Sequence, residues 1–300
     1  MSLVEQALAR MRSQAGVTKP SAKRKRPSDQ GSAPIQAPVD EVVEPLEPAK
    51  RMTLDSASMR AKGYLPEESR DRQFADHYRR IKRPLIDAAL AASPEQNDAR
   101  VIMVTSALPG DGKTFTSINL ALSMALERDI SVLLIDCDVA KRHISQIVGM
   151  EQESGLLDAL LEESIDVETL VAQTNIKGLS ILPAGRHVET SPELLSSNRM
   201  RQIITELFER NPRRILLLDS PPLLITNESR SLLKMAGQIA LVVRAGHTSR
   251  HAVQEALALF DPEQRGGLIL NQVATSSGEY IYGYDSYGYH RESGADANKT

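Results

Sequence analysis

The alternation of short apolar runs with amphipathic stretches between residues 101 and 273 limits the possible folds more than any other feature. The apolar runs are VIMVTS, SVLLIDCD, LSILPAG, RILLLDS, QIALVVRA and GGLILNQV. They are almost continuously apolar, as are the strands of a parallel sheet buried on both faces. The segments between them have helical periodicity, for example TSINLALSMALER and HAVQEALALF. We therefore predict an α/β fold with a mostly parallel sheet covered by helices on both faces.

The first apolar run is followed directly by SALPGDGKT, which has the arrangement of a phosphate-binding P-loop. Glycines in the loop allow the backbone to curl so that its N–H groups converge on an anion, and the following helix directs its positive end toward the phosphates. Lys113 then reaches the β and γ phosphate oxygens, and the Thr114 hydroxyl binds Mg²⁺. We expect a nucleotide to contact Gly110, Asp111, Gly112, Lys113, Thr114 and Phe115.

Carboxylates stand where two of the apolar runs end. The run VLLIDCD supplies Asp136 and Asp138, and ILLLDSPP supplies Asp219. Ligands of a parallel sheet bind at the C-terminal ends of its strands, and Mg²⁺ prefers oxygen ligands beside phosphates. We therefore predict a metal-binding or catalytic role for these three aspartates. Cys137, between two of them, is expected to pack inward as a small side chain.

Asn271 ends the last apolar run, in LILNQV, and two interpretations of it remain open. Its amide either hydrogen-bonds an adenine edge or acts as an ordinary cap at the end of a strand.

The sequence before residue 69 differs in composition from the rest. Residues 1–16 place Leu3, Ala7, Leu8 and Met11 on one face of a short amphipathic helix, which either docks on a partner or frays. Residues 18–50 hold six of the sixteen prolines. Such a segment buries too little apolar surface to offset its ordering entropy, so we predict a disordered linker over residues 17–68. The domain with the P-loop is expected over residues 69–277.

The segment RDRQFADHYRRIKRPLIDAALA predicts a helix at the start of this domain. Phe74, Tyr78, Ile81 and Leu85 recur at helical spacing and form one apolar stripe. Pro84 is expected to kink this helix or to restart it. The helix either lies on the domain surface or contacts another subunit.

Five of the seven tyrosines lie in the C-terminal segment, residues 278–300, within GEYIYGYDSYGYHRES. This polar, glycine-spaced segment is unsuited to a core, so we predict a flexible tail. The alternative is a C-terminal strand, because Tyr280, Tyr282 and Tyr284 alternate along the chain.

Overall composition excludes several classes of protein. The net charge of −3 gives no global field for binding nucleic acid. The single Cys137 excludes an intramolecular disulfide and fits a reducing cytosol. No apolar run approaches the ~18 residues that a membrane span needs, so a membrane role is expected to come through a partner or a surface contact.

Taken together, SALPGDGKT, LLIDCDVAKR, LLLDSPPLL and the tyrosine-rich tail resemble the bacterial tyrosine kinases, which are P-loop autokinases of capsule and exopolysaccharide systems. Supporting segments are SGLLDALL, LPAG, SPELL and GLILNQV. The segments MSLVEQAL and HYRRIKRPL are similar to the cytoplasmic, exosortase-associated subgroup. The resemblance covers roughly residues 70 to 290.

The resemblance implies a P-loop NTPase fold and transfer of the γ-phosphoryl group of ATP to tyrosine. Lys113 and the loop amides would neutralise the phosphates, Thr114 and Asp136 would hold Mg²⁺, and Asp219 would bind it directly or through water. Asp138 or Asp136 would be the base. The acceptors would be Tyr280, Tyr282, Tyr284, Tyr287 and Tyr289.

The resemblance also implies partners and a location. The kinase would form a homo-oligomeric ring, and a separate membrane-embedded polysaccharide co-polymerase would activate it. It would be cytoplasmic and recruited to the inner face of the membrane by that partner.

Two departures from the family pattern affect these expectations. Ala140 stands where the Asp-x-Asp-x-Arg motif has arginine, and Lys141 and Arg142 follow it. The oligomerisation motif Glu-x-x-Arg-x-x-Arg reads Asp76, Arg79 and Lys82, and lysine lacks the bidentate fork of arginine.

Two other functions remain open. A partition-type ATPase switch would carry a second lysine early in the P-loop, where this chain has Leu108. The second alternative is a non-catalytic, ATP-gated scaffold. It remains open because the arginine of the Asp-x-Asp-x-Arg motif is displaced after Asp138.

Overall fold

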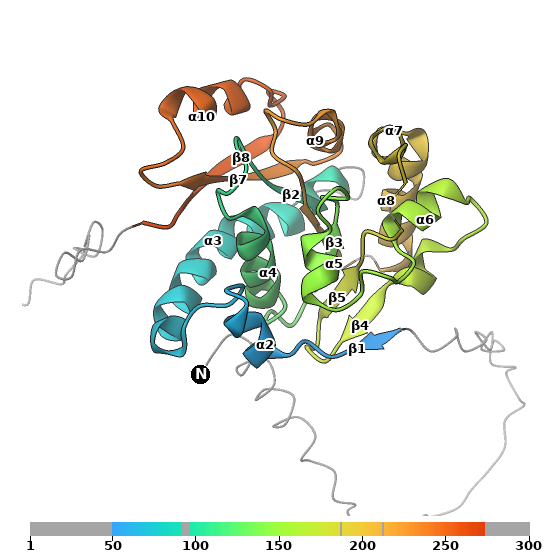
Figure 1. Ribbon diagram of the computed structural model, residues 1–300, viewed down its shortest axis with the longest axis horizontal. Coiled ribbons are helices and arrows are strands. Elements are labelled where there is room, and N and C mark those ends of the chain that lie inside the picture. Colours follow the sequence, from blue (N-terminus) through green and yellow to red (C-terminus); the bar gives the residue numbers. More distant parts are fainter. Residues whose placement is uncertain (1–49, 92–96, 187, 212, 274–300) are drawn as a thin grey trace, which may run out of the picture.

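The computed structural model describes residues 50–91, 97–186, 188–211 and 213–273 of the chain. Its centre is an eight-stranded sheet with the order β1-β4-β5-β3-β6-β2-β7-β8 (Figure 1). Neighbouring strands are parallel except β4 and β5, which are antiparallel. The strands are β1 (Arg51–Met52), β2 (Val101–Ser106), β3 (Ser131–Asp136), β4 (Ala172–Thr174), β5 (Leu179–Leu182), β6 (Arg214–Asp219), β7 (Gln238–Arg244) and β8 (Arg265–Asn271).

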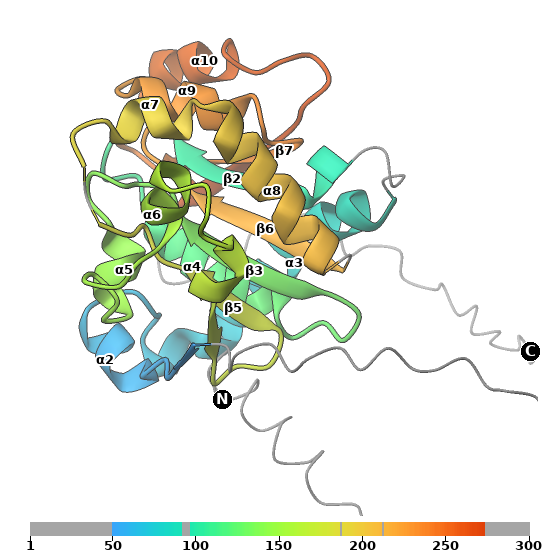
Figure 2. The ribbon, with the colours of Figure 1, turned by 90° about the vertical axis from the view of Figure 1, so that its right-hand side faces the viewer.

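Helices cover both faces of the sheet and enclose two apolar cores. One core packs against α2 (Ser56–Ala61), α3 (Asp71–Ala91), α4 (Lys113–Met124) and α5 (His143–Ile147). The other packs against α6 (Leu156–Leu161), α7 (Ser191–Leu195), α8 (Asn198–Arg210), α9 (Asn227–Leu233) and α10 (Arg250–Leu257). Figure 2 shows α8 running along the face opposite α3 and α4. Short 3-10 helices are η1 (Glu68–Arg70), η2 (Asn97–Arg100) and η3 (Val167–Leu170).

This architecture confirms the predicted α/β fold, and each of the predicted apolar runs contains a strand. Strands β1 and β4 were not predicted, because segments of two and three residues carry too little periodicity to detect. None of the helices in the described part of the chain is long and apolar enough to cross a membrane.

The predicted linker over residues 17–68 is wrong for residues 50–68. Leu54, Met59 and Leu65 are buried in the core beside α3 and α4. The carboxylate of Asp55 caps α2 by accepting hydrogen bonds from the N–H groups of the next turn. These three apolar side chains, the pairing of β1 with β4 and the ion pair of Arg60 with Asp71 together dock the segment on the domain. The predicted N-terminal helix, residues 17–49 and the tyrosine tail lie outside the described residues.

Helix α3 differs from its prediction in two respects. It continues through Pro84, so the predicted restart does not occur. Its buried positions are Asp71, Ala75, Tyr78, Lys82, Ile86 and Ala89, whereas Phe74, Ile81 and Leu85 are only partly buried. The buried stripe is therefore displaced from the one that apolar residues alone predicted.

Lys82 belongs to this buried stripe, because its ammonium has partners inside the subunit. It donates a hydrogen bond to the Ser123 carbonyl (2.6 Å) and forms an ion pair with Glu127 (2.9 Å). Asp76 and Arg79, the other members of the proposed oligomerisation motif, form an exposed ion pair with each other. Lys82 is thus engaged within the fold rather than presented to a neighbouring subunit.

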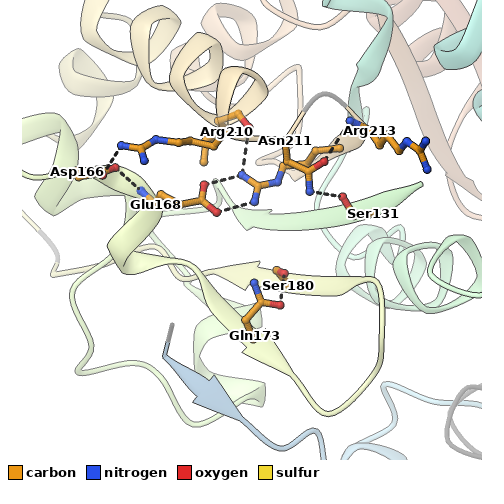
Figure 3. Close-up of polar contacts among 10 residues, drawn as sticks. Ser131, Asp166, Glu168, Gln173, Ser180, Arg210, Asn211 and Arg213 are labelled. Atoms are coloured by element: carbon orange, nitrogen blue, oxygen red, sulfur yellow. Dashed lines mark hydrogen bonds and ion pairs between the residues drawn. The ribbon is translucent and has the colours of Figure 1, made fainter. Parts of the chain in front are cut away.

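An ion pair between Arg214 and Glu168 ties β6 to η3 at the start of the strand. The Arg214 guanidinium makes two hydrogen bonds to the Glu168 carboxylate (2.7 and 2.6 Å), and its side chain is 6% exposed. Figure 3 shows the Glu168 carboxylate with these contacts and, beside it, the Asp166–Arg210 pair, which is far more exposed. A buried ion pair and an exposed ion pair therefore lie next to each other, so the loss of stability on breaking each of them can be compared.

We expect Arg214→Met to lower the free energy of unfolding by about 3 kcal/mol, because it leaves Glu168 without its bidentate partner. Arg210→Met, which breaks the exposed pair, should cost less than about 1 kcal/mol. Urea unfolding of the two variants measures the difference. Equal losses would contradict a special contribution from Arg214.

Candidate nucleotide-binding site

The P-loop lies between β2 and α4, as predicted, and its two glycines adopt left-handed backbone conformations. Gly110 has φ +85° and Gly112 has φ +93°. A Cβ added to Gly112 would lie 2.1 Å from the Asn271 side-chain amide nitrogen. The backbone therefore requires glycine at Gly112 both for its φ angle and for the close approach of Asn271.

Hydrogen bonds of Asp111 and Asn271 hold the P-loop in its conformation. The Asp111 carboxylate accepts hydrogen bonds from the Thr248 hydroxyl (2.7 Å) and the Leu108 N–H (3.4 Å). The Asn271 amide nitrogen donates to the Asp111 carbonyl (2.9 Å). The contact of Asn271 supports the strand-end interpretation, because its amide N–H holds the loop. Thr248 was missed by sequence reasoning, since a threonine after a strand carries no distinctive signal.

Asp219 at the end of β6 is held by two hydroxyl groups of α4. The Thr114 hydroxyl donates to its Oδ2 (2.9 Å) and the Ser117 hydroxyl donates to its Oδ1 (2.8 Å). Both oxygens of this fully buried carboxylate therefore have partners. The contact joins the predicted loop residue Thr114 to the predicted strand-end residue Asp219. Ser117 was not predicted, because nothing in the sequence indicates which polar face of α4 meets β6.

Asp136 lies beside Asp219, since the two aspartates are register partners on neighbouring strands. Its Oδ2 accepts hydrogen bonds from the Ser145 N–H (2.8 Å) and hydroxyl (2.7 Å). Its Oδ1 is buried and has no hydrogen-bond partner among the described residues. A buried carboxylate oxygen without a partner is costly, and a bound ion or water is one of the ways in which such an atom is satisfied.

The paired carboxylates and Lys113 have shifted pKa values. Burial raises the pKa of Asp136 to about 6, and hydrogen bonds from Ser145 oppose the shift. Burial and the neighbouring Asp136 raise the pKa of Asp219 to about 7. Burial lowers the pKa of the Lys113 ammonium, while Asp219 and Asp138 act in the opposite direction. A bound cation near these carboxylates would favour their charged forms.

We expect the stability of the nucleotide-free protein to depend on Asp219 between about pH 4 and pH 7. The unfolded carboxyl ionises near ~4, below its folded pKa of about 7, so the unfolded state binds fewer protons in this interval. The stability of the wild type should therefore fall relative to Asp219→Asn as the pH rises. Urea unfolding at stepped pH measures this difference, and a constant difference would contradict the raised pKa.

The displaced arginine after Asp138, Arg142, makes its contacts within the domain. Arg142 has φ +50°, and its guanidinium donates to the carbonyls of Glu151 (3.3 Å) and Gly185 (3.4 Å). The main-chain carbonyl of Asp138 closes this turn by accepting from Lys141 N–H and Arg142 N–H. The displaced arginine therefore supports neighbouring loops. The Asp138 side chain is 3% exposed.

Phe115 and Cys137 pack into the domain. The Phe115 ring meets Phe74 of α3 edge-on, with ring centroids 6.0 Å apart. Cys137 is fully buried, which confirms the predicted inward packing, and burial raises the pKa of its thiol.

The residues at the strand ends suit Mg²⁺ bound together with a nucleotide rather than an all-protein metal cage. In the part of the chain that the structure describes, no three His, Cys, Asp or Glu side chains group as metal ligands. Mg²⁺ is commonly held by one or two carboxylates plus substrate phosphates. The unpartnered Asp136 Oδ1 and the Thr114 hydroxyl provide two oxygens of the required kind.

The AAA domain family matches residues 99–263, more than half of the chain. The tyrosine-protein kinase YwqD of Bacillus subtilis is 32% identical over 184 residues, which are 60% of this chain and 76% of that protein. The tyrosine-protein kinase wzc of Salmonella typhimurium is 30% identical over 201 residues, 66% of this chain. The chain spans about a quarter (27%) of the length of that second relative.

Solved structures agree with these relatives. The crystal structure of the VpsO kinase domain is 32% identical, with a TM-score of 0.54, and the match covers 67% of this chain and 99% of that domain. The BceF tyrosine kinase domain is 26% identical, with a TM-score of 0.52, and the match covers 73% of this chain and 90% of that one. The chain belongs to the AAA domain family of P-loop proteins and, within it, to the bacterial tyrosine-protein kinases.

Proposed function

We propose that this protein is an ATP-dependent tyrosine kinase that phosphorylates its own C-terminal tyrosines. The observation that carries the proposal is the meeting of the P-loop with the strand-end carboxylates, through the hydrogen bond from the Thr114 hydroxyl to Asp219 (2.9 Å). The curated relatives are named tyrosine-protein kinases, and the five tyrosines between Tyr280 and Tyr289 provide acceptors within the same chain.

The P-loop would bind and orient the phosphates of ATP. Loop N–H groups and the N-terminus of α4 attract the anion, and the Lys113 ammonium adds a positive charge beside it. Mg²⁺, when bound, would neutralise charge on the phosphate oxygens, held by Thr114 and Asp136, with Asp219 next to both. Because Lys113 and these carboxylates are buried, water is largely excluded from their surroundings. Such positioning accounts for most of the catalysis of phosphoryl transfer.

A tyrosine acceptor must lose its proton during the transfer. A free phenol has a pKa near ~10, so a carboxylate placed beside it is needed to accept the proton at neutral pH. Asp138 lies close enough to Lys113 and His143 to influence the pKa of each. Since Asp136 and Asp219 are engaged with hydroxyl groups, we assign the base to Asp138, with Asp136 as the alternative.

The biological setting is proposed from the family. The kinase would regulate exopolysaccharide synthesis or export, be activated by a separate membrane-embedded co-polymerase, and act in the cytoplasm at the inner face of the membrane. A ring built through α3 would depend on Asp76 and Arg79, because Lys82 is bound to Ser123 and Glu127 within the subunit.

Incubating the purified full chain with labelled ATP and Mg²⁺, with and without a membrane-embedded co-polymerase of the proposed kind, tests the proposal. We expect label on tyrosine. ATP-dependent dimerisation with rapid hydrolysis and no phosphotyrosine under either condition would instead favour a partition-type ATPase. Nucleotide binding without turnover would favour a scaffold.

A further inference from the structure

Ser145 on α5 contacts Asp136 of the candidate site, although the two residues are nine positions apart in the sequence. Both its N–H (2.8 Å) and its hydroxyl (2.7 Å) donate to the same oxygen, Oδ2, of Asp136. The hydroxyl oxygen in turn accepts a hydrogen bond from the Ala184 N–H (3.0 Å), after β5. Ser145 is 1% exposed, and these contacts use its hydroxyl both as donor and as acceptor.

The hydrogen bonds are distributed differently over the carboxylate oxygens of the neighbouring Asp219 and Asp136. Asp219 receives one hydroxyl on each oxygen, from Thr114 and Ser117. Both hydrogen bonds from Ser145 go to Oδ2 of Asp136. The Asp138 backbone N–H also favours the charged carboxylate, and Oδ1 has no partner at ordinary hydrogen-bond geometry in the described part of the chain. Both residues are 0% exposed, so bulk solvent does not reach this oxygen. Ser145 therefore occupies Oδ2 of Asp136 and leaves Oδ1 without a hydrogen bond from α5.

The position of Ser145 is itself fixed by the loop after β5. The Ala184 N–H holds its hydroxyl oxygen. Asp158 holds the adjoining part of this loop, because its carboxylate accepts from the Arg186 N–H (3.2 Å) and guanidinium (2.7 Å) and from the Gly155 N–H (2.8 Å). A buried hydroxyl held from both sides has little freedom to rotate. The carboxylate that it holds is correspondingly oriented.

We infer that Ser145 is a positioning residue that orients Asp136 so that its Oδ1 is available to the Mg²⁺–ATP complex. This inference rests on the proposed function, because it assigns a role to Asp136 in that same site. Groups that orient a metal ligand from behind typically affect metal affinity or activity about 10- to 100-fold when removed. Ser145 would act in this way without touching the nucleotide.

The test uses the full chain and three variants. Ser145→Ala removes the hydroxyl, and Ser145→Thr retains it. Ser229→Ala is the matched control, because the Ser229 hydroxyl is equally buried but donates only to the backbone carbonyls of Pro222 and Thr226. Two quantities are measured: the affinity for a fluorescent ATP analogue with and without Mg²⁺, and the Mg²⁺ concentration that gives half-maximal tyrosine labelling.

We expect Ser145→Ala to lose about tenfold or more of the nucleotide affinity that Mg²⁺ adds, with unchanged affinity in the absence of Mg²⁺. Its half-maximal Mg²⁺ concentration should rise by a similar factor. Ser145→Thr and Ser229→Ala should behave as the wild type. A Ser145→Ala variant with wild-type Mg²⁺ dependence in both measurements would overturn the inference.

A further variant and a second measurement distinguish a folding defect, and a failure of the proposed kinase activity, from a failure of the inference about Ser145. If Ser145→Ala does not fold, Ser145→Cys replaces it, since a thiol of similar size is a weaker donor. Ser145→Cys should then require more Mg²⁺ than Ser145→Thr, and equal requirements would overturn the inference. If the wild type labels no tyrosine, the proposed kinase activity fails, while the Mg²⁺ dependence of nucleotide affinity still decides the role of Ser145.

Discussion

Lys113→Ala should reduce tyrosine phosphorylation by about 100-fold or more, because it removes the side-chain cation of the P-loop. Lys113 is the first residue of α4 and is 7% exposed. It lies close enough to Asp219 and Asp138 for both carboxylates to favour its charged form. In the proposed complex its charge would lie beside the phosphates and would be poorly screened by water, so its loss should have a large effect.

Lys234→Ala serves as the control for this substitution, since Lys234 is an exposed lysine at the end of another helix, α9. It should label like the wild type. Phosphotyrosine formation from labelled ATP is followed over time for each protein, and folding is checked by circular dichroism. If Lys113→Ala is labelled at a rate within about threefold of the wild type, the P-loop cation is not needed for phosphorylation. That result would contradict the role of Lys113 in holding the phosphates of ATP.

Replacing all five tail tyrosines by phenylalanine should remove most of the phosphotyrosine while ATP binding is retained. The substitutions are at Tyr280, Tyr282, Tyr284, Tyr287 and Tyr289. Only hydroxyl groups are lost, and none of these residues belongs to the P-loop or the strand ends. Of the two remaining tyrosines, Tyr78 is a poor alternative acceptor, because it is 5% exposed and burial raises the pKa of its phenol. Tyr64 is partly buried and is tested by its own variant.

The matched control is Tyr64→Phe, which removes one hydroxyl from the folded domain. It should leave both labelling and ATP binding at the wild-type level. Fluorescent ATP-analogue binding and phosphotyrosine immunoblotting are measured on the same preparations. Substantial phosphotyrosine on the five-fold variant would place the acceptors elsewhere in the chain, and loss of ATP binding would give the tail a role that we do not assign to it.

The sequence predicted the sheet well because its central strands are long and fully buried. Strands such as β2 and β6 are buried at every position and have an apolar run of four residues, and glycine and proline mark the segments beyond them. The P-loop was equally clear, since its backbone geometry demands specific residue types. In both cases the physical requirement falls on consecutive residues, so a single sequence shows it.

The features that were missed depend on residues far apart in the chain. Ser145 contacts Asp136 across nine positions, Ser117 contacts Asp219 across 102, and Thr248 contacts Asp111 across 137. Small hydroxyl residues occur throughout the sequence, and only the fold shows which of them meet a carboxylate. The docking of residues 50–68 was missed for the same reason, because Leu54 and Met59 find their apolar partners on α4 and β3.

Mapping of phosphotyrosine by mass spectrometry, on the full chain incubated with ATP and Mg²⁺ together with the proposed co-polymerase activator, tests the central proposal most directly. The wild type should carry phosphate on one or more of the tyrosines from Tyr280 to Tyr289 and Lys113→Ala on none of them. Absence of phosphotyrosine from residues 278–300 of an ATP-binding wild type would contradict the proposal.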